Sequence, residues 1–530
     1  MPDDDKLQHR SVAASFLLRF PNDDTSQRPK VALFRRSDKV RTYQCVDPLF
    51  LALPFLRMPN QSCTKACCSH APRHKYAPIS GSVDPSDPSP FHTAVREIRE
   101  ETSLAPPLIR LFRTGKPYSF RDDAVGRVWH IHPFAFVLSV RATEAAHIKL
   151  DWEHDGYAWF DVEDVGAVGD GVPRLGESLR RVWFDLDLGE EAGGALARGL
   201  LALQRDHESG ARQLAGKAVD IFVDVVARLN PSSRDAWWRN ARLAAWHLWK
   251  NGREAMGASI LSVLLTSLSL IEARLPPAST APLPTAFTDD AVAAINGFSE
   301  RHGKSSERIA SSFAAFLAET FPEKKHVTIL TLSHSSTISS CIAHALRDPA
   351  APSLGMRVLE SRPLFEGVAL ARSLADTIAT TPCPSSTATI YTDACAAIAS
   401  RSIDMLLLGA DLIDRAGRVS NKAGSLPAVL CARHVAPAAK VVALAEKSKV
   451  LPFDPPHQEL EENDPGELVR AWGEARPSPG RVKVRNAYFE WVPQGLVDSY
   501  VTEDGVLTTG GIEAWATEER KRADGFFSDL

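Results

Sequence analysis

The chain has 530 residues, of which 44% are hydrophobic and 24% charged, and its formal net charge is −4. This length exceeds what one hydrophobic core supports, so we expect two to four domains of roughly 150 residues each. A slightly acidic balance gives no global reason to expect binding to nucleic acid or to an anionic membrane, and neither is predicted as a partner.

The first residues, MPDDDKLQHRSV, lack the apolar core of a signal peptide. The most apolar run, Gly257–Leu275, is interrupted by serines and is short for a membrane span, so we interpret it as a buried helix. Without a secretion signal, the eight cysteines are expected to be free thiols in a reduced, cytoplasmic protein.

The first third of the chain has the pattern of an α/β domain, which we place at 1–190. Apolar segments rich in β-branched and aromatic residues predict strands at 11–20, 30–36 and 128–140. Helices are predicted over 94–104 and near 175–183. From 190 to 274 the apolar spacing predicts an almost continuous series of helices.

A Pro/Ser/Thr-rich break at 276–287 is predicted to be an exposed loop, and further helices are expected from 288 to 321. We place a middle helical domain at 195–325. Beyond it, short apolar runs alternate with helical segments and predict a parallel sheet in a third domain, 326–530. The predicted strands of this sheet lie at 326–332, 356–361, 387–394, 404–411 and 439–445.

The segment AVREIREETSL (94–104) carries the first chemical pattern. Glu97, Glu100 and Glu101 fall at i, i+3 and i+4, which places three carboxylates on one side of a helix. Such a face is either a solvated surface with ion pairs or a site for a hard cation, which prefers oxygen ligands.

The flanking residues resemble the Nudix hydrolase box, G-x5-E-x7-R-E-U-x-E-E-x-G-U with U aliphatic. The matching residues are Gly81, Arg96, Glu97, Ile98, Glu100, Glu101 and Leu104. The resemblance implies an α/β/α sandwich that hydrolyses a nucleoside diphosphate linked to another moiety. It also implies Mg²⁺ (or Mn²⁺) held by Glu97, Glu100 and Glu101, with Arg96 orienting them, so that Arg96, Glu100 and Glu101 are the expected catalytic residues.

Three features depart from the box. The loop between Gly81 and Arg96 is longer by about one residue, and its glutamate is replaced, with Asp87 the nearest acid. The final glycine is Ser103, although a left-handed helix end is easy only for glycine. On a later strand, Glu153 and His154 are further candidates for the pocket.

Residues 45–73 read as an insert before the box. Cys63, Cys67, Cys68, His70 and His74 could form a zinc site, but their spacing matches no closed pattern. The alternative that we prefer is a disordered insertion, with an unspliced intron as a hypothesis for its origin, and sequencing the transcript across this region tests that hypothesis.

A second resemblance covers some 300 residues. It is to the family that contains the alpha, beta and delta subunits of the translation initiation guanine-nucleotide exchange factor and the isomerases of ribose 1,5-bisphosphate and methylthioribose 1-phosphate. The matching segments are 206–215, 251–257, 329–337, 358–367, 391–394, 407–425, 443–450 and 486–505. This resemblance implies a Rossmann-like sheet, homodimers through the C-terminal half and initiation-factor-like protein partners.

Asp411 follows an apolar strand, and ligands of such sheets bind beyond the carboxyl ends of strands. The resemblance implies that Asp411 is a catalytic acid/base for a phosphosugar. It also implies substrate contacts from a set of polar side chains: Arg253, Ser333, Ser335, Asn421, Lys422 and Lys449. The isomerases carry a cysteine at the position of Ser333, and serine is a far poorer acid/base than a thiol near neutral pH.

Two functions follow. In the first, a Nudix hydrolase is fused to a module that binds or isomerises a sugar phosphate or nucleotide. ADP-ribose is then an economical hypothetical substrate, because its cleavage releases ribose 5-phosphate. In the second, a non-catalytic, initiation-factor-like scaffold senses a nucleotide through its Nudix domain.

The complete glutamate triad favours the first function for the N-terminal part, whereas Ser333 argues against isomerisation.

Overall fold

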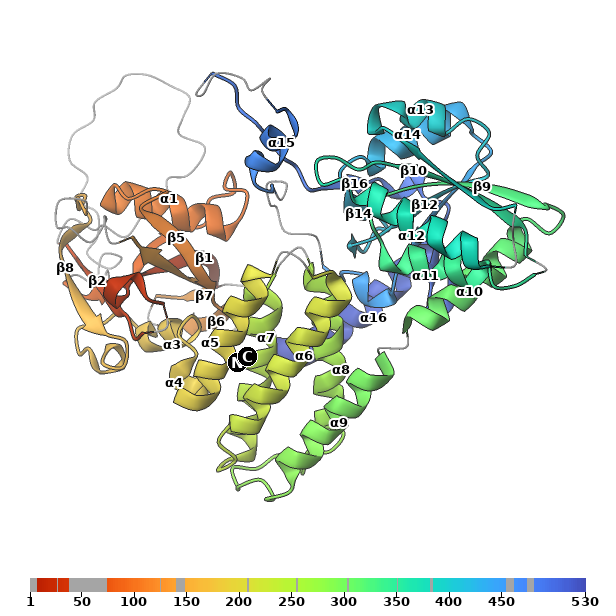
Figure 1. Ribbon diagram of the computed structural model, residues 1–530. Helices are drawn as coiled ribbons and strands as arrows, with labels where there is room; N and C mark the ends of the chain where they lie inside the picture. The colour runs from red at the N-terminus through yellow and green to blue at the C-terminus, as the bar shows by residue number, and fades with distance from the viewer. Residues whose placement is uncertain are drawn as a thin grey trace. The chain divides into compact units, whose positions relative to one another are not determined.

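The computed structural model describes residues 7–25, 27–37, 74–123, 125–139, 148–206, 209–253, 256–302, 305–349, 351–381, 385–453, 462–473 and 481–530. The chain forms two compact units, residues 1–198 with Leu530 and residues 199–529 (Figure 1). Each unit combines a sheet with helices, so the fold is of the mixed α/β kind that the sequence indicates.

The first unit is built on a mixed eight-stranded sheet. Its strands are β1 (Gln8–Arg19), β2 (Lys30–Arg36), β3 (Tyr76–Ala77), β4 (Ile79–Ser82), β5 (Ile109–Thr114), β6 (Tyr118–Asp122), β7 (Arg127–Leu138) and β8 (His154–Asp161). β1 is parallel to β7 and antiparallel to β2 and β4. The first half of β7 is partly exposed and its second half is buried.

The helices of this unit are α1 (Pro90–Thr102), α3 (Leu175–Arg180), α4 (Asp185–Leu188), the short 3₁₀ turns η2 (Pro21–Asp23) and η4 (Val165–Ala167), and α5 (Glu190–Arg205), which runs across the boundary between the units. α1 begins after Ser89 with a proline at its first position, where the missing N–H costs nothing. It ends at Ser103, which adopts a left-handed conformation with φ of 60°.

Both faces of this sheet carry apolar clusters. Leu17 and Phe34 pack on one face with Ala94 and Ile98 of α1. Phe16 and Leu18 pack on the other face with Leu175 and Leu179 of α3, among others. Adjacent residues of β1 therefore point to opposite sides, and α1 rests on one defined face of the sheet.

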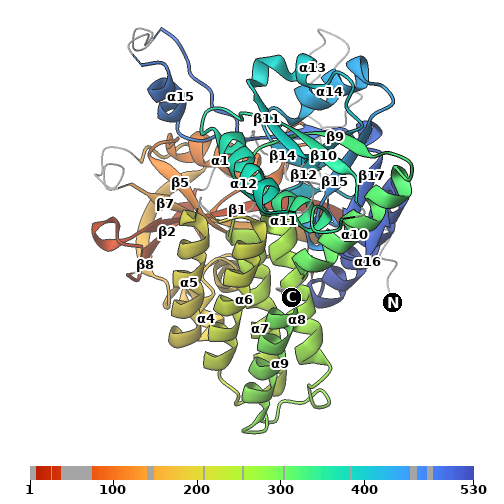
Figure 2. The same ribbon diagram turned by 45° about the vertical axis from the view of Figure 1, so that its right-hand side comes forward.

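The second unit begins with antiparallel and crossing helices that pack on one another (Figures 1 and 2). They are α6 (Ala211–Arg228), α7 (Arg234–Asn251), α8 (Gly257–Glu272), α9 (Phe287–His302) and α10 (Ser305–Thr320). The apolar run at 257–275 forms α8, which is largely buried, as predicted. Among the described residues, no helix is long and apolar enough to cross a membrane.

A seven-stranded sheet follows, in the order β11-β10-β9-β12-β15-β17-β18. Its pairs are parallel up to β17, and β18 is antiparallel. Its strands are β9 (His326–Leu332), β10 (Ser353–Leu359), β11 (Thr387–Tyr391), β12 (Met405–Gly409), β15 (Lys440–Leu444), β17 (Ser499–Thr502) and β18 (Gly505–Leu507). A smaller sheet contains β13 (Leu412–Ile413), β14 (Val419–Lys422) and β16 (Phe489–Val492).

Helices cover both faces of the seven-stranded sheet (Figure 2). α10, α11 and α12 contribute to the core on one face, and α13, α14 and α16 to the core on the other. The helices not yet placed are α11 (Ser336–Ala345), α12 (Glu366–Thr380), α13 (Ala396–Ala399), α14 (Ser425–Val435), α15 (Pro465–Ala471), α16 (Thr509–Phe527) and the 3₁₀ turns η6 (Asp393–Cys395), η7 (Lys447–Lys449) and η8 (Gln494–Leu496).

The predicted domain limits at 190, 195 and 325 stay predictions; the helices α6–α10 and the seven-stranded sheet belong to one compact unit. Cys341, Cys395 and Cys431 are free thiols, as expected. The predicted insert at 45–73 lies outside the described residues, together with all of its possible zinc ligands except His74.

Candidate functional site

Arg96 lies in the middle of α1, between three carboxylates. Its Nη1 atom is 2.8 Å from Oε1 of Glu97 and 3.2 Å from Oε2 of Glu100. Its Nη2 atom donates to Asp87 at 3.0 Å, and Asp87 also accepts a hydrogen bond from Thr93. The guanidinium thus holds two of the three predicted metal ligands, an arrangement consistent with an orienting role for Arg96.

Glu101 points the other way, into the first unit, where it is only 3% exposed. Its Oε2 atom lies 3.5 Å from Nδ1 of His154, and neither atom has a hydrogen-bond partner within the described structure. Burial, and then the charges of Glu97, Glu153 and Asp151, raise the pKa of Glu101 to about 9. Burial also raises the pKa values of Glu97 and Glu153.

The position of Gly81, in β4 before α1, has no room for a side chain. A Cβ atom at this position would lie 1.9 Å from Oε1 of Glu97, so any other residue would displace that carboxylate. Since Gly81 pairs with Ala13 of β1, the sheet fixes the backbone of β4 against the helix. The predicted leading glycine therefore touches a predicted metal ligand.

Arg36 and Asp151 are site residues that the sequence patterns did not indicate. Arg36 ends β2 and donates from Nη2 to Ser80 at 3.1 Å. Burial lowers its pKa, an effect that the nearby charges of Glu101 and Glu153 oppose. A basic residue at the end of a predicted strand is too common a pattern to have singled it out.

Carboxylate oxygens are suitable ligands for a hard divalent cation, but in this structure the glutamates of α1 do not converge on one point. A buried glutamate oxygen without a hydrogen-bond partner lies among carboxylates that raise its pKa and that outnumber the two nearby cations, Arg36 and Arg96. However, no three His, Cys, Asp or Glu side chains of the described residues are arranged so that they could hold a metal ion. Glu97 and Glu100 face Arg96, whereas Glu101 faces His154.

The second predicted site lies at the carboxyl ends of β9 and β12. These strands are neighbours at the centre of the sheet, and they pair only over Ile329 and Leu330 of β9. Ser333, directly after β9, has φ of 64°, and its N–H donates to Oγ of Ser361 at 2.7 Å. Ser335 caps the N-terminus of α11.

Asp411 follows β12 and is surrounded by cations. Its N–H donates to the carbonyl of Ser420 across the short hairpin at 2.9 Å. Burial raises the pKa of its carboxyl group, and the charges of Lys449, Lys422 and Arg253 oppose that effect. The structure therefore brings Asp411 and three of the predicted substrate contacts into one electrostatic neighbourhood.

Each of these cations is already held by the protein. Lys422 lies 2.8 Å from Oε2 of Glu366 and 3.6 Å from the ring centroid of Tyr488. Arg253 donates to the carbonyl of Asp206 at 2.7 Å. Lys449 donates to the carbonyl of Ala410 at 2.5 Å.

The remaining predicted contacts, Asn421 and Ser335, meet at Gly409. A Cβ atom at Gly409 would lie 3.4 Å from Oδ1 of Asn421 and 3.5 Å from Oγ of Ser335. Asn421 also donates to Ser425 at 2.9 Å. Among the described residues, Ser333 contacts none of the other predicted residues through a hydrogen bond; its partner is Ser361.

Glu366 and Tyr488 are the residues that the sequence patterns missed here. The hydroxyl of Tyr488 donates to Oε1 of Glu366 at 3.3 Å, and burial raises the pKa of Tyr488. Both residues lie inside matched segments, 358–367 and 486–505, but neither is part of a pattern that points to a role.

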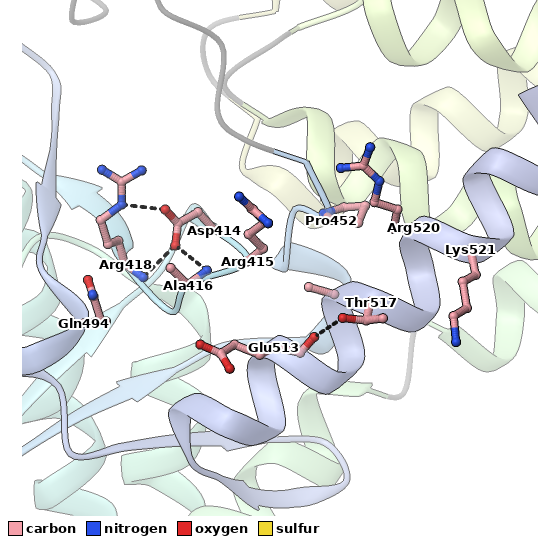
Figure 3. A pocket seen from close by; sticks show the side chains of 11 residues that line it. Asp414, Arg415, Ala416, Arg418, Pro452, Gln494, Glu513, Thr517, Arg520 and Lys521 are labelled. Atoms are coloured by element: carbon pink, nitrogen blue, oxygen red, sulfur yellow. Dashed lines mark hydrogen bonds and ion pairs between the residues drawn. The ribbon is translucent and has the colours of Figure 1, made fainter. Parts of the chain in front are cut away.

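A cavity of about 640 Å³ lies at the far end of the β13–β14 hairpin, beside α16 (Figure 3). Its described lining is Asp414, Arg415, Ala416, Arg418, Pro452, Gln494, Glu513, Ala516, Thr517, Arg520 and Lys521. None of the predicted site residues is in this lining, and Arg418 is held by Asp414. We therefore place the candidate chemistry at the two residue clusters and not in this cavity.

Comparison with known proteins finds a family model for each of two parts of the chain. A family model for the NUDIX domain matches residues 61–182, and one for the initiation factor 2 subunit family matches residues 263–509. A methylthioribose-1-phosphate isomerase of Syntrophotalea carbinolica is 36% identical over 106 residues, which are 20% of this chain and 30% of that protein. One of Xanthomonas campestris pv. campestris is 33% identical over 122 residues, 23% of this chain and 34% of that protein.

The chain thus spans about a third of the length of the curated relatives that it matches. Among solved structures, the translation initiation factor eIF-2B of Pyrococcus horikoshii OT3 has 23% identity and a TM-score of 0.41, covering 59% of this chain and 96% of that one. The 5-methylthioribose 1-phosphate isomerase of the same organism has 18% identity and a TM-score of 0.42, covering 62% and 87%. The chain combines a NUDIX domain with a domain of the initiation factor 2 subunit family.

Proposed function

We propose that the NUDIX domain hydrolyses a nucleoside diphosphate linked to another moiety, with Mg²⁺ or Mn²⁺ as cofactor. The observation that carries this proposal is Glu101, a buried glutamate whose Oε2 atom has no hydrogen-bond partner among the described residues and which lies beside Glu97 and Glu153. Glu97, Glu100 and Glu101 are the residues that would hold the ion.

When bound, a divalent cation neutralises the pyrophosphate and lowers the pKa of a bound water. The protein supplies the rest. Arg96 holds Glu97 and Glu100 in place through its Nη1 atom. Burial and the charges of Glu97, Glu153 and Asp151 disfavour a charged Glu101, so a bound cation would favour the carboxylate form of this residue.

Turnover of a nucleotide panel tests this proposal. Purified protein is incubated with Mg²⁺ and ADP-ribose, NADH, dinucleoside polyphosphates and nucleotide sugars, and the products are separated by chromatography. We expect a nucleoside monophosphate from at least one substrate and a loss of at least 100-fold in the Glu101→Gln variant, since removing a ligand or base costs on this order. Equal rates in the wild type and Glu101→Gln would exclude this site as the source of the activity.

We further propose that the second domain contains a Rossmann-like sheet and binds a phosphosugar or a nucleotide. The carrying observation is the cluster of Arg253, Lys422 and Lys449 around Asp411, at the point where the strand order reverses between β9 and β12. Such points receive ligands in open parallel sheets, and cations of this kind bind phosphate oxygens.

Ser333 favours binding over isomerisation as the role of this site. This supports a second candidate function, a regulatory or scaffolding protein that assembles with initiation-factor-like partners while its NUDIX domain senses a nucleotide.

Calorimetric titration with ribose 5-phosphate, ribose 1,5-bisphosphate and AMP tests ligand binding by the second domain. Lys422→Met is the variant expected to lose this binding. Light scattering of the purified chain tests the expected homodimer.

A further inference from the structure

A row of serine and histidine side chains lies on the sheet of the first unit, on the same face as α1. Oγ of Ser119 is hydrogen-bonded to Nδ1 of His130 at 2.7 Å. Nε2 of His130 lies 2.9 Å from Nδ1 of His9. Next to them, Oγ of Ser11 lies 2.9 Å from Nε2 of His132. We call Ser11, Ser119, His130 and His132 the histidine shelf.

The strand register places the shelf beside the glutamates of α1. His132 of β7 pairs with Ala13 of β1, and Ala13 pairs with Gly81 of β4, whose added Cβ would strike Glu97. Side chains in one row across a sheet share a face, and strands lie about 4.8 Å apart. His132 is therefore about 10 Å from Gly81, two strands away on the side of the sheet that carries Glu97.

The first half of β7 stays partly exposed on the face that carries α1. Phe91 in its first turn packs against Phe134 and Phe136, the next residues of β7 on that face. His130 and His132, further towards the start of β7, keep part of their surface exposed. A ligand that reaches the glutamates thus has the histidine shelf next to it.

The chemistry of the shelf suits an uncharged polar group and not a phosphate. Burial and the neighbouring His130 lower the pKa of His132, so this imidazole is neutral near pH 7. Its Nδ1 atom has no hydrogen-bond partner among the described residues. His9 and His130 already stack, with ring centroids 5.2 Å apart, and the face of such a ring accepts a further flat ring.

We infer that the histidine shelf binds the nucleoside part of the substrate, with hydroxyl or base-edge groups on Ser11 and His132 and the base against His130. This inference rests on the proposed hydrolysis of a nucleoside diphosphate, because it assigns the part of that substrate that does not react. It makes the shelf a determinant of specificity, separate from the glutamates that act on the diphosphate.

Binding and kinetics together test the inference. The 5′-monophosphates of adenosine, guanosine, cytidine and uridine are titrated without metal into wild type, His132→Phe and Ser11→Ala. Ile131→Val, between the two shelf histidines but on the opposite face of β7, is the matched control. We expect at least one monophosphate to bind wild type and Ile131→Val with equal affinity, and at least fivefold more weakly to His132→Phe and Ser11→Ala.

For the substrate that the wild type cleaves fastest, His132→Phe is expected to raise KM at least fivefold while kcat changes less than twofold. Binding that depends on the shelf in a protein without any turnover would support the shelf and reject the proposed hydrolysis. Turnover with unchanged KM and Kd in both shelf variants would overturn the inference, as would a wild type that binds none of the four monophosphates.

Discussion

The carboxylate of Glu101 and the imidazole of His154 face each other inside the first unit at 3.5 Å, and neither facing atom makes a hydrogen bond within the described structure. A buried carboxyl group in this position costs stability whenever it is charged. A bound cation or a proton removes that cost, so function and stability are expected to oppose each other at this residue.

The Glu101→Gln variant is expected to be more stable than the wild type in metal-free buffer. The folded pKa of Glu101 is about 9, above its ordinary value of 4.5, so its contribution to stability is complete below pH 4.5 and is lost as the pH rises towards 9. Glutamine does not ionise, so the Glu101→Gln variant does not lose this stability as the pH rises. The difference between variant and wild type should grow with pH, by at most about 1.4 kcal/mol per pH unit. Thermal unfolding in EDTA between pH 5 and 8 measures it.

Glu100→Gln is the matched control, because its side chain is largely exposed and pairs with Arg96 at the surface. Its unfolding temperature should follow that of the wild type at every pH, within the small effect of an exposed ion pair. Parallel curves for the wild type and Glu101→Gln would contradict the expected cost of burying Glu101.

Mg²⁺ or Mn²⁺ should stabilise the wild type and not a variant without the three glutamates. An ion that binds only the folded state raises the unfolding free energy by about 2.7 kcal/mol at 100 times its dissociation constant. Titration of each ion at pH 8, followed by thermal unfolding, measures the shift. Equal shifts in the wild type and in Glu97→Gln/Glu100→Gln/Glu101→Gln would show that the ion binds elsewhere.

The sequence was informative wherever a pattern is local. The strand of β9 and the position of Asp411 after an apolar strand agree with the structure, because an apolar run and the residue that ends it are adjacent in the chain. The three glutamates were predicted to act together. Their spacing places them on one side of α1. On that side Glu100 is exposed and Glu101 is buried. The periodicity of a sequence predicts which residues share a side of a helix, but it does not predict which of them are buried.

Residues that reach a site across the sheet were beyond local patterns. Arg36 comes to Glu101 because β2 ends beside β8, and Tyr488 comes to Lys422 because β16 pairs with β14. The shelf histidines are similar: only the parallel register of β1 with β7 places Ser11 beside His132. Such neighbours depend on strand pairing, which a single sequence does not determine.

Ser103→Gly is expected to stabilise the first unit by about 0.5–1 kcal/mol, because Ser103 ends α1 with φ of 60°, where a side chain is strained and glycine is not. Denaturant unfolding measures the difference. Ser89→Gly is the comparison at the other end of α1; its extended backbone gains nothing from glycine, and it loses the exposed hydrogen bond between Oγ of Ser89 and Nδ1 of His92, so no stabilisation is expected. A destabilised Ser103→Gly variant would show that the Ser103 side chain contributes more than its strain costs.

Ser333→Cys is expected to introduce or increase isomerase activity in the second domain. Ser333 follows β9, beside the strand that leads to Asp411, and a thiol has a pKa of about 8.5, far closer to neutrality than a serine hydroxyl. We expect conversion of methylthioribose 1-phosphate or ribose 1,5-bisphosphate, followed by NMR, at least tenfold above the wild type. Adding Asp411→Asn should abolish the gain, since the proton transfer needs a second acid/base.

Ser336→Cys controls for the presence of a new thiol near this turn, because Ser336 is exposed on α11 and outside the cluster around Asp411. It should leave the wild-type rate unchanged. Ser333→Cys could bind the phosphosugar and convert none of it. In that case the cations around Asp411 hold the ligand in a pose that does not allow proton transfer. Binding is then favoured over catalysis as the role of this domain.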